Sequence, residues 1–122
     1  MVYACGMGSL SEQSFLILTA LADRPCHGYA LVAEVSAISK GRIELRASTL
    51  YAALERLTDR GLVEPDHDEV ESGRLRRYYR LTDKGAAEVQ TEAQRMAAQA
   101  RAAQRRLASR AQRSGARLGT VG

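Results

Sequence analysis

The stretch from Glu44 to Gly85, ELRASTLYAALERLTDRGLVEPDHDEVESGRLRRYYRLTDKG, decides the fold of this chain. Within it, leucines recur at intervals of four and then three residues, which places them on one stripe of a helix that begins near Ser48: Leu50, Leu54 and Leu57. Gly61 stands where a helix commonly ends in a residue with a left-handed backbone. The first part of the stretch therefore predicts a helix with one buried side.

The second part of the stretch is typical of a β-hairpin. Residues 62–63 are apolar, and residues 77–81 are rich in side chains that suit a pleated, half-buried surface. Residues 65–73 between them are polar, and Ser72-Gly73 supplies the turn. We therefore expect two short strands and a hairpin whose far side carries three arginines: Arg74, Arg76 and Arg77.

Together, the helix and the hairpin have the properties of a surface that binds DNA. The residues outside the leucine stripe are small or polar, so the helix backbone can come close to the floor of a major groove. Arginines on a neighbouring hairpin can then reach phosphates or a narrow minor groove. The alternative is a solvated surface helix and hairpin without any partner.

Two more helices are expected before this stretch. Ser9 and Glu12 have the spacing of a capping box, which predicts a helix over residues 11–22. The next helix opens at His27 and ends near residue 39. We expect Tyr29 to be packed in the core with its hydroxyl at the rim, and the alternative is a direct contact with DNA. After a turn, residues 43–45 are expected to be extended and to pair with the edge of the hairpin.

A long helix is expected after the hairpin. Thr82 followed by Asp83 suits its N-terminal cap. Small and apolar residues then recur at alternating intervals of three and four, as in a heptad seam: Ala86, Val89, Ala93, Met96, Ala100, Ala103 and Leu107. Such a seam requires a partner helix, so we expect a homodimer in which Phe15 and Leu18 of the first helix also contribute. The alternative is a single solvated helix.

Three motifs, in this order, resemble the PadR family of bacterial transcriptional regulators. They are GYALVAEV at 28–35, STLYAALERLTDRGLVE at 48–64 and RRYYRLTDKG at 76–85. The resemblance implies an α+β, mostly helical fold. Residues 9–81 would form a winged helix-turn-helix domain of three helices and a β-hairpin wing, and residues 82–108 a dimerisation helix. Residues 1–8 would then be a flexible arm and residues 109–122 a basic, disordered tail.

The function implied by the resemblance is that of a sequence-specific DNA-binding regulator, a repressor that binds a palindromic operator in double-stranded DNA as a homodimer. The expected DNA contacts come from a turn, the helix and the wing: Lys40, Arg42, Ser48, Thr49, Tyr51, Ala52, Arg56, Arg74, Arg76 and Arg77. Tyr51 lies on the flank of the helix, where it could pack against the first helix or point its hydroxyl at a phosphate. In the family, a tyrosine at this place lies beside the groove, so we expect the contact with a phosphate. Family members also bind small aromatic molecules between protomers. Phe15, Leu18 and Met96 could line a space for such a ligand, but core packing explains these residues equally well, so both readings stay open.

Composition limits the other classes of function. The chain has 122 residues, enough for one small domain, and its 45% apolar and 26% charged shares are those of a globular protein. No apolar run is long enough to cross a bilayer and no secretory signal is evident, so we expect a cytoplasmic protein without membrane association. Cys5 and Cys26 are expected to be free thiols.

Neither an enzyme nor a cofactor is expected. The sequence contains no Ser-His-Asp set, nucleophile elbow, phosphate loop or metal-ligand spacing around His27 and His67. Charge alone does not prove DNA binding, since residues 1–81 hold 10 Lys and Arg against 11 Asp and Glu. A winged-helix module that binds another protein through its wing arginines is therefore the alternative function.

Overall fold

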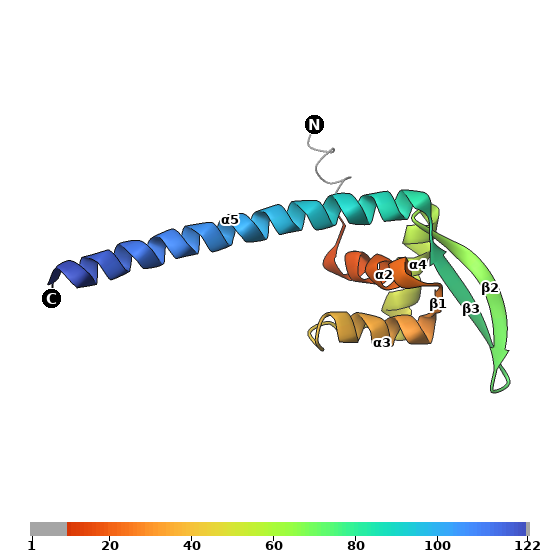
Figure 1. The fold of residues 1–122 in the computed structure, drawn as a ribbon. Helices are drawn as coiled ribbons and strands as arrows, with labels where there is room; N and C mark the ends of the chain where they lie inside the picture. The colour runs from red at the N-terminus through yellow and green to blue at the C-terminus, as the bar shows by residue number, and fades with distance from the viewer. Residues whose placement is uncertain (1–9, 122) are drawn as a thin grey trace. The chain divides into compact units, whose positions relative to one another are not determined.

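The structure is a computed structural model that describes residues 10–121, with side chains described for residues 10–115. The chain divides after Glu92 into two compact units. The elements follow the order α2 (Glu12–Asp23), β1 (Cys26–His27), α3 (Gly28–Ile38), α4 (Ala47–Asp59), β2 (Val63–Glu71), β3 (Arg74–Leu81) and α5 (Asp83–Val121) (Figure 1). This mostly helical α+β fold, with three helices and a hairpin before a long helix, confirms the predicted fold class.

Helices α2 and α3 lie side by side in the first unit, and α4 crosses behind them in Figure 1. The start of α2 differs from its prediction. Ser11 caps the helix, and its hydroxyl accepts a hydrogen bond of 3.1 Å from the backbone N–H of Ser14. Glu12 is thus the first helical residue, which rules out its predicted place in a capping box; Ser9 lies outside the described residues.

The leucine stripe of α4 is confirmed. Leu50, Leu54 and Leu57 are each almost fully buried, and they pack with residues of α2 and α3 in one hydrophobic core. After the C-terminal cap at Arg60, Gly61 has a φ of +76°, in the left-handed region that glycine adopts without strain. The helix therefore ends where the sequence predicts.

The sheet is antiparallel, in the order β1-β3-β2. The hairpin of β2 and β3, here called the wing, is longer than predicted. Its strands pair up to Glu71 and Arg74, and only Ser72 and Gly73, with φ of +51° and +79°, form the turn. The expectation of a polar loop over residues 65–73 is therefore wrong, because charged residues on both solvated faces of a strand resemble a loop in sequence.

The third strand also differs from its prediction. Cys26 pairs with Tyr79 and His27 with Tyr78, so the edge strand β1 lies directly before α3. Residues 43–45, which were expected to form this edge, have no strand pairing in the structure. This short strand brings the start of α3 against β3.

A tight junction connects α4, β2 and the start of α5. The Thr82 hydroxyl donates a hydrogen bond of 2.6 Å to the carbonyl of Gly61 and accepts one of 3.0 Å from the N–H of Gly85, which confirms Thr82 as the cap of α5. A Cβ on Gly85 would come within 2.1 Å of the carbonyl oxygen of Leu62. Glycine is therefore required at position 85.

Helix α5 continues to Val121. The predicted helix end at residue 108, with a disordered tail after it, is thus corrected for residues 109–121, which are helical. Arginine and alanine favour helix there, although serine and glycine suggest a tail in sequence. Among residues 10–121, no helix combines the length and apolar character of a membrane span.

Candidate nucleic-acid interface

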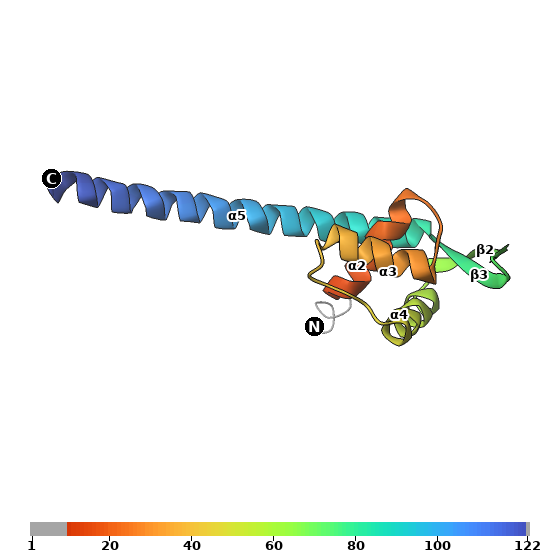
Figure 2. The same ribbon diagram turned by 90° about the horizontal axis from the view of Figure 1, so that it is seen from below.

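The side of α4 away from the core is open to solvent. Four of the residues expected to contact DNA are exposed there, as the leucine stripe requires: Ser48, Thr49, Ala52 and Arg56. Figure 2 shows α4 at the border of the first unit, with the wing at one end of the helices. The residue at the N-terminal cap of α4 is Arg46, and its side chain accepts no hydrogen bond from the first N–H groups of the helix.

A groove of about 610 Å³ lies between the start of α3, the start of α4 and β3. It brings together three predicted DNA contacts, Tyr51, Arg74 and Arg76. The other lining residues are mainly small or apolar: Gly28, Tyr29, Val32, Ala33, Ser36, Glu44, Leu45, Ala47 and Leu50. The remaining predicted contacts do not line this groove: Lys40, Arg42, Ser48, Thr49, Ala52, Arg56 and Arg77.

Tyr51 projects across the groove to the first residue of α3. A Cβ placed on Gly28 would lie 2.3 Å from the Tyr51 hydroxyl oxygen and 2.7 Å from its Cζ. The side chain of Tyr51 is still 51% exposed. The packing alternative for Tyr51 is therefore present in the structure, though against α3, and its exposed surface leaves room for a partner.

Tyr29 is where the sequence prediction was wrong. It was expected in the core, but it is 71% exposed, because the first turn of α3 extends past the buried Leu31 and Val35. The guanidinium carbon of Arg76 lies 5.4 Å from the centroid of the Tyr29 ring, a cation–π distance. The sequence therefore led to the wrong place for Tyr29, and the alternative to core packing, a direct contact with DNA, stays a prediction.

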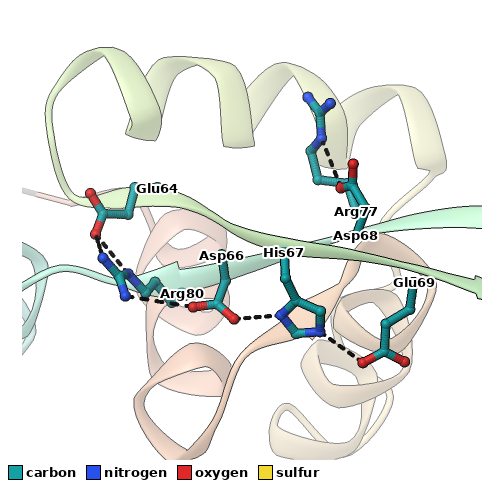
Figure 3. Close-up of polar contacts among 7 residues, drawn as sticks. All are labelled: Glu64, Asp66, His67, Asp68, Glu69, Arg77 and Arg80. Carbon is teal, nitrogen blue, oxygen red and sulfur yellow. Dashed lines mark hydrogen bonds and ion pairs between the residues drawn. The ribbon is translucent and has the colours of Figure 1, made fainter.

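The wing arginines are largely paired with carboxylates, as Figure 3 shows for two of them. Arg77 Nε is 3.4 Å from Asp68 Oδ1, and Arg76 Nε is 3.4 Å from Glu71 Oε1. Arg80 forms ion pairs with Glu64 and Asp66. These carboxylates follow from the acidic sequence of β2, whose residues stand opposite the arginines in the strand register. The wing is therefore far less positive than its arginines alone suggest.

His67 lies within this network on the wing. Its Nδ1 is 2.5 Å from Asp66 and its Nε2 is 2.8 Å from Glu69 (Figure 3). Its ring also stacks on that of Tyr78, with the ring centroids 4.4 Å apart. The hydrogen bonds with Asp66 and then Glu69 raise the pKa of His67 above its usual value. A hydrogen bond of 2.8 Å to Glu71 is the main cause that raises the pKa of Tyr78 to about 12.

Five basic residues of the first unit form no ion pair with any residue in the described part of the chain: Lys40, Arg46, Arg56, Arg74 and Lys84, of which Lys84 instead donates a hydrogen bond of 2.8 Å to the carbonyl of Arg60. Of the predicted contacts, Arg42 is instead paired with Glu12. Arg46 was missed by sequence reasoning, although a basic residue directly before a recognition helix is a usable signal. Unpaired guanidinium and ammonium groups are the ones most available to phosphate.

The amino-acid sequence matches the family described as "Transcriptional regulator PadR-like family" over residues 17–91, more than half of the chain. The chain belongs to the PadR-like family. The match covers α3, α4 and the wing completely and therefore includes the groove. The family is described as one of transcriptional regulators, which agrees with the expected function class.

This PadR-like chain is also similar to individual known proteins. An uncharacterised protein of Lysinibacillus sphaericus is 31% identical over 72 residues, which are 59% of this chain and 66% of the relative, just under two thirds of its length. A PadR family transcription regulator from hypervirulent Clostridium difficile R20291 is 23% identical, with a TM-score of 0.67 over 80% of this chain and 99% of that one.

Bacillus subtilis PadR, solved in complex with operator DNA, is 21% identical to this chain. Its TM-score is 0.59, and the likeness covers 68% of this PadR-like chain and 47% of the other. At such identities, these two structures show a shared fold. The winged-helix arrangement of α3, α4 and the wing is thus the PadR fold.

The residues expected at a dimer interface of this PadR-like chain fall into two groups. Leu18 has no exposed surface, and Phe15 and Val89 are partly buried against the core of the first unit. Leu18 is therefore a core residue of the single chain, and its predicted place at the interface is wrong. The others are exposed: Ala86, Ala93, Met96, Ala100, Ala103 and Leu107.

The remaining reactive groups of the first unit are structural. Cys26 is a free, buried cysteine, and burial is the main cause that raises the pKa of its thiol. The N–H of Ala30 donates a hydrogen bond of 3.2 Å to His27 Nδ1, which makes His27 the cap of α3. Within residues 10–121, no three His, Cys, Asp or Glu side chains gather in a way that could hold a metal ion.

Proposed function

We propose that this PadR-like protein is a sequence-specific DNA-binding repressor that acts as a homodimer on a palindromic operator. One observation carries the proposal: the exposed, small and polar face of α4 stands beside a groove that gathers Tyr51, Arg74 and Arg76. Such a surface suits a helix in the major groove with cations beside the backbone. The complex of Bacillus subtilis PadR with operator DNA supports this reading.

In this proposal, α4 enters the major groove. Ser48, Thr49 and Ala52 are short, so the helix axis can approach the base edges, where serine and threonine form hydrogen bonds and alanine contacts the methyl group of thymine. Arg56, one turn further along the helix, is exposed and long enough to reach a base edge or a phosphate.

The phosphates are held by the basic residues around α4. Arg74 and Lys40 have no carboxylate partner in the described part of the chain, so they contribute most of the attraction. Arg42, Arg76 and Arg77 contribute less, because each must share its charge with Glu12, Glu71 or Asp68. Arg46 joins this set from its position at the start of α4.

The dimer forms through the exposed stripe of α5. Ala93, Met96, Ala100, Ala103 and Leu107 recur at the spacing of a heptad seam, and all are exposed in the single chain. A two-fold dimer presents α4 twice, and a palindromic operator with half-sites one helical turn apart, about 34 Å, is its match. Alanine buries little area, so Ala86 and the exposed part of Phe15 would need to add to the contact.

Relief of repression by a small aromatic effector completes the proposal. Such a molecule would bind between the protomers, where the exposed Met96 on α5 offers apolar contact. By favouring one arrangement of the dimer, it would change the spacing of the two α4 helices and so the affinity for the operator. A repressor acts on the chromosome, so the proposal also implies that the protein is cytoplasmic.

A winged-helix module that binds another protein is the second candidate. It is favoured by Val70 and Leu75, which stand opposite each other near the tip of the wing and are 71% and 69% exposed. An apolar pair of this kind suits a protein surface, and the partly neutralised wing arginines suit it as well.

An electrophoretic shift assay separates the two candidates. The purified protein is titrated onto the duplex immediately upstream of its own gene and onto a duplex of the same composition in scrambled order. A regulator retards the first at lower protein concentration than the second and does so in the presence of excess competitor. An absence of retardation of either duplex, even at low salt, would favour the interaction module.

A further inference from the structure

Tyr29 has an exposure that core packing does not explain. It is 71% exposed, although Leu31 and Val35 on the same helix are fully buried. Its hydroxyl forms no hydrogen bond with any residue among those described. Exposed aromatic side chains with a free polar end are enriched at binding surfaces, because they supply contact area with little loss of conformational freedom.

The ring of Tyr29 is nevertheless held in place. Arg76 stands over it, with the guanidinium carbon 5.4 Å from the ring centroid. Arg76 is held in turn by Glu71, whose Oε1 is 3.4 Å from its Nε. The contact with Arg76 restricts the ring of Tyr29 beside the groove, which lowers the entropy cost of binding a ligand there.

The groove has the chemistry of a site for a sugar–phosphate backbone. Two tyrosines and two arginines are among the residues that line it: Tyr29, Tyr51, Arg74 and Arg76. Tyrosine and arginine side chains are regular donors to phosphate oxygens in protein–DNA complexes. Val32 and other apolar residues between them can contact the deoxyribose, and Glu44 is the one carboxylate among the described lining residues.

We propose that this groove binds the backbone of one DNA strand and that the Tyr29 hydroxyl donates a hydrogen bond to a phosphate oxygen in it. The inference rests on the proposed function, since it requires DNA to lie on α4. It assigns a role to a residue outside the recognition helix. A contact from the start of α3 would fix the direction and depth of α4 in the major groove, as phosphate contacts do in general.

Replacing the tyrosine hydroxyl alone tests this contact. Tyr29→Phe keeps the ring under Arg76 and removes only the donor, whereas Tyr79→Phe removes a hydroxyl from a residue packed against the core and outside the groove. We expect Tyr29→Phe to bind the operator about tenfold more weakly, the loss of one hydrogen bond to a charged group. Its salt dependence should stay unchanged because no charge is removed. Tyr79→Phe should bind like the original chain.

A cycle with modified DNA identifies the phosphate. Operator duplexes that carry a neutral methylphosphonate at one position are bound by the original chain and by Tyr29→Phe. At the phosphate that Tyr29 contacts, the modification should weaken the original chain more than the variant, and the two losses should not add. Arg76→Gln should also reduce the effect of Tyr29→Phe, because the ring loses its support.

The outcomes distinguish this inference from the function on which it rests. If the original chain retards no duplex, the proposed function fails. If the original chain binds its operator but Tyr29→Phe binds equally well, the assignment of Tyr29 is overturned while the proposed function remains. The same holds if the loss of affinity from Tyr29→Phe simply adds to that from the methylphosphonate at every phosphate tested. The circular dichroism spectrum and the melting temperature of Tyr29→Phe should match those of the original chain, since Tyr29 is exposed.

Discussion

The hydroxyl of Tyr51 occupies the space that a side chain at Gly28 would need, since a Cβ on Gly28 would come within 2.3 Å of that oxygen. Two of the sequence motifs therefore depend on each other: the glycine that opens α3 makes room for the tyrosine that projects from α4. Because Tyr51 is half-exposed, its ring can swing away if the space is filled.

Gly28→Ala should for this reason affect binding more than stability. Alanine is a better helix former than glycine by about 1 kcal/mol, which offsets part of the cost of the displaced ring, so we expect a change of less than about 1 kcal/mol in the free energy of unfolding. Affinity for the operator should fall several-fold as Tyr51 moves out of the groove. Urea denaturation and a binding titration measure the two effects.

The control for this prediction is Gly28→Ala in a chain that lacks the Tyr51 ring. In a Tyr51→Ala background, Gly28→Ala has nothing to displace, and it should then leave operator affinity as it is and stabilise the helix. An equal loss of affinity from Gly28→Ala in both backgrounds would show that the glycine acts by another route.

The ion pairs of the wing predict a gain of affinity from the loss of a carboxylate. Asp68→Asn frees Arg77 from its 3.4 Å partner and removes a negative charge that faces the DNA. Binding should become several-fold tighter, and the slope of log affinity against log salt should steepen by up to about one unit. Glu88→Gln on α5, which frees Arg60 at the end of α4 instead, is the matched control and should change neither. Weaker binding of Asp68→Asn would contradict the pairing account.

The wing also marks the limit of what the sequence predicts. The turn at Ser72 and Gly73 and the strand through Tyr78 and Tyr79 were predictable, because turn residues and aromatic alternation are local signals. The ladder of arginine–carboxylate pairs depends on strand register across the turn. The acidic residues of β2 were noticed in sequence as charge, but their partners could be named only once the register was known.

His67 predicts a pH dependence in the wing. Its pKa is raised by Asp66 and then by Glu69, so the protonated imidazole is favoured in the folded state. The stabilisation is fully present below about pH 6.5, the value of an unperturbed histidine, and is lost as the pH rises through the folded-state pKa. Asp66→Asn should lower the pKa of His67, as measured by NMR titration of the imidazole. An unchanged titration would show that the hydrogen bond with Asp66 does not hold the proton.

Replacing Gly85 should lower the stability of the fold without any direct effect on DNA contacts. A Cβ at this position would meet the backbone carbonyl of Leu62 at 2.1 Å, and backbone cannot move aside as a side chain can. Gly85→Ala should lower the free energy of unfolding by about 2 kcal/mol. Gly115→Ala is the control, because nothing lies within 4 Å of that position, and it should be neutral or stabilising. Equal effects at both positions would contradict the account of the junction.

Part of the helical fold was predictable in the same way. The stripe of Leu50, Leu54 and Leu57 placed α4 correctly, because periodic burial is a strong local signal. The edge strand at Cys26 and His27 is too short to have a period, and its pairing with β3 spans some fifty residues of sequence. Tyr29 follows the period of the apolar residues on α3 but lies beyond the edge of the core, which no sequence pattern indicates.

The seam on α5 predicts that the protomers separate when it is blocked. Ala100→Trp places a bulky ring on the exposed stripe, whereas Ala98→Trp places the same ring on an exposed position outside it. We expect the first variant to sediment as a single chain and to bind the operator weakly, and the second to remain a dimer. A dimer of Ala100→Trp as stable as the original would remove this stripe from the interface.

The most direct test of the central claim, that the protein reads a two-fold operator with α4, is to map the bases it protects upstream of its own gene. The account predicts two protected patches of related sequence in inverted orientation, with centres about 10 base pairs apart along the duplex. Uniform protection along the DNA, a single patch without a symmetric mate, or no protection at all would contradict it.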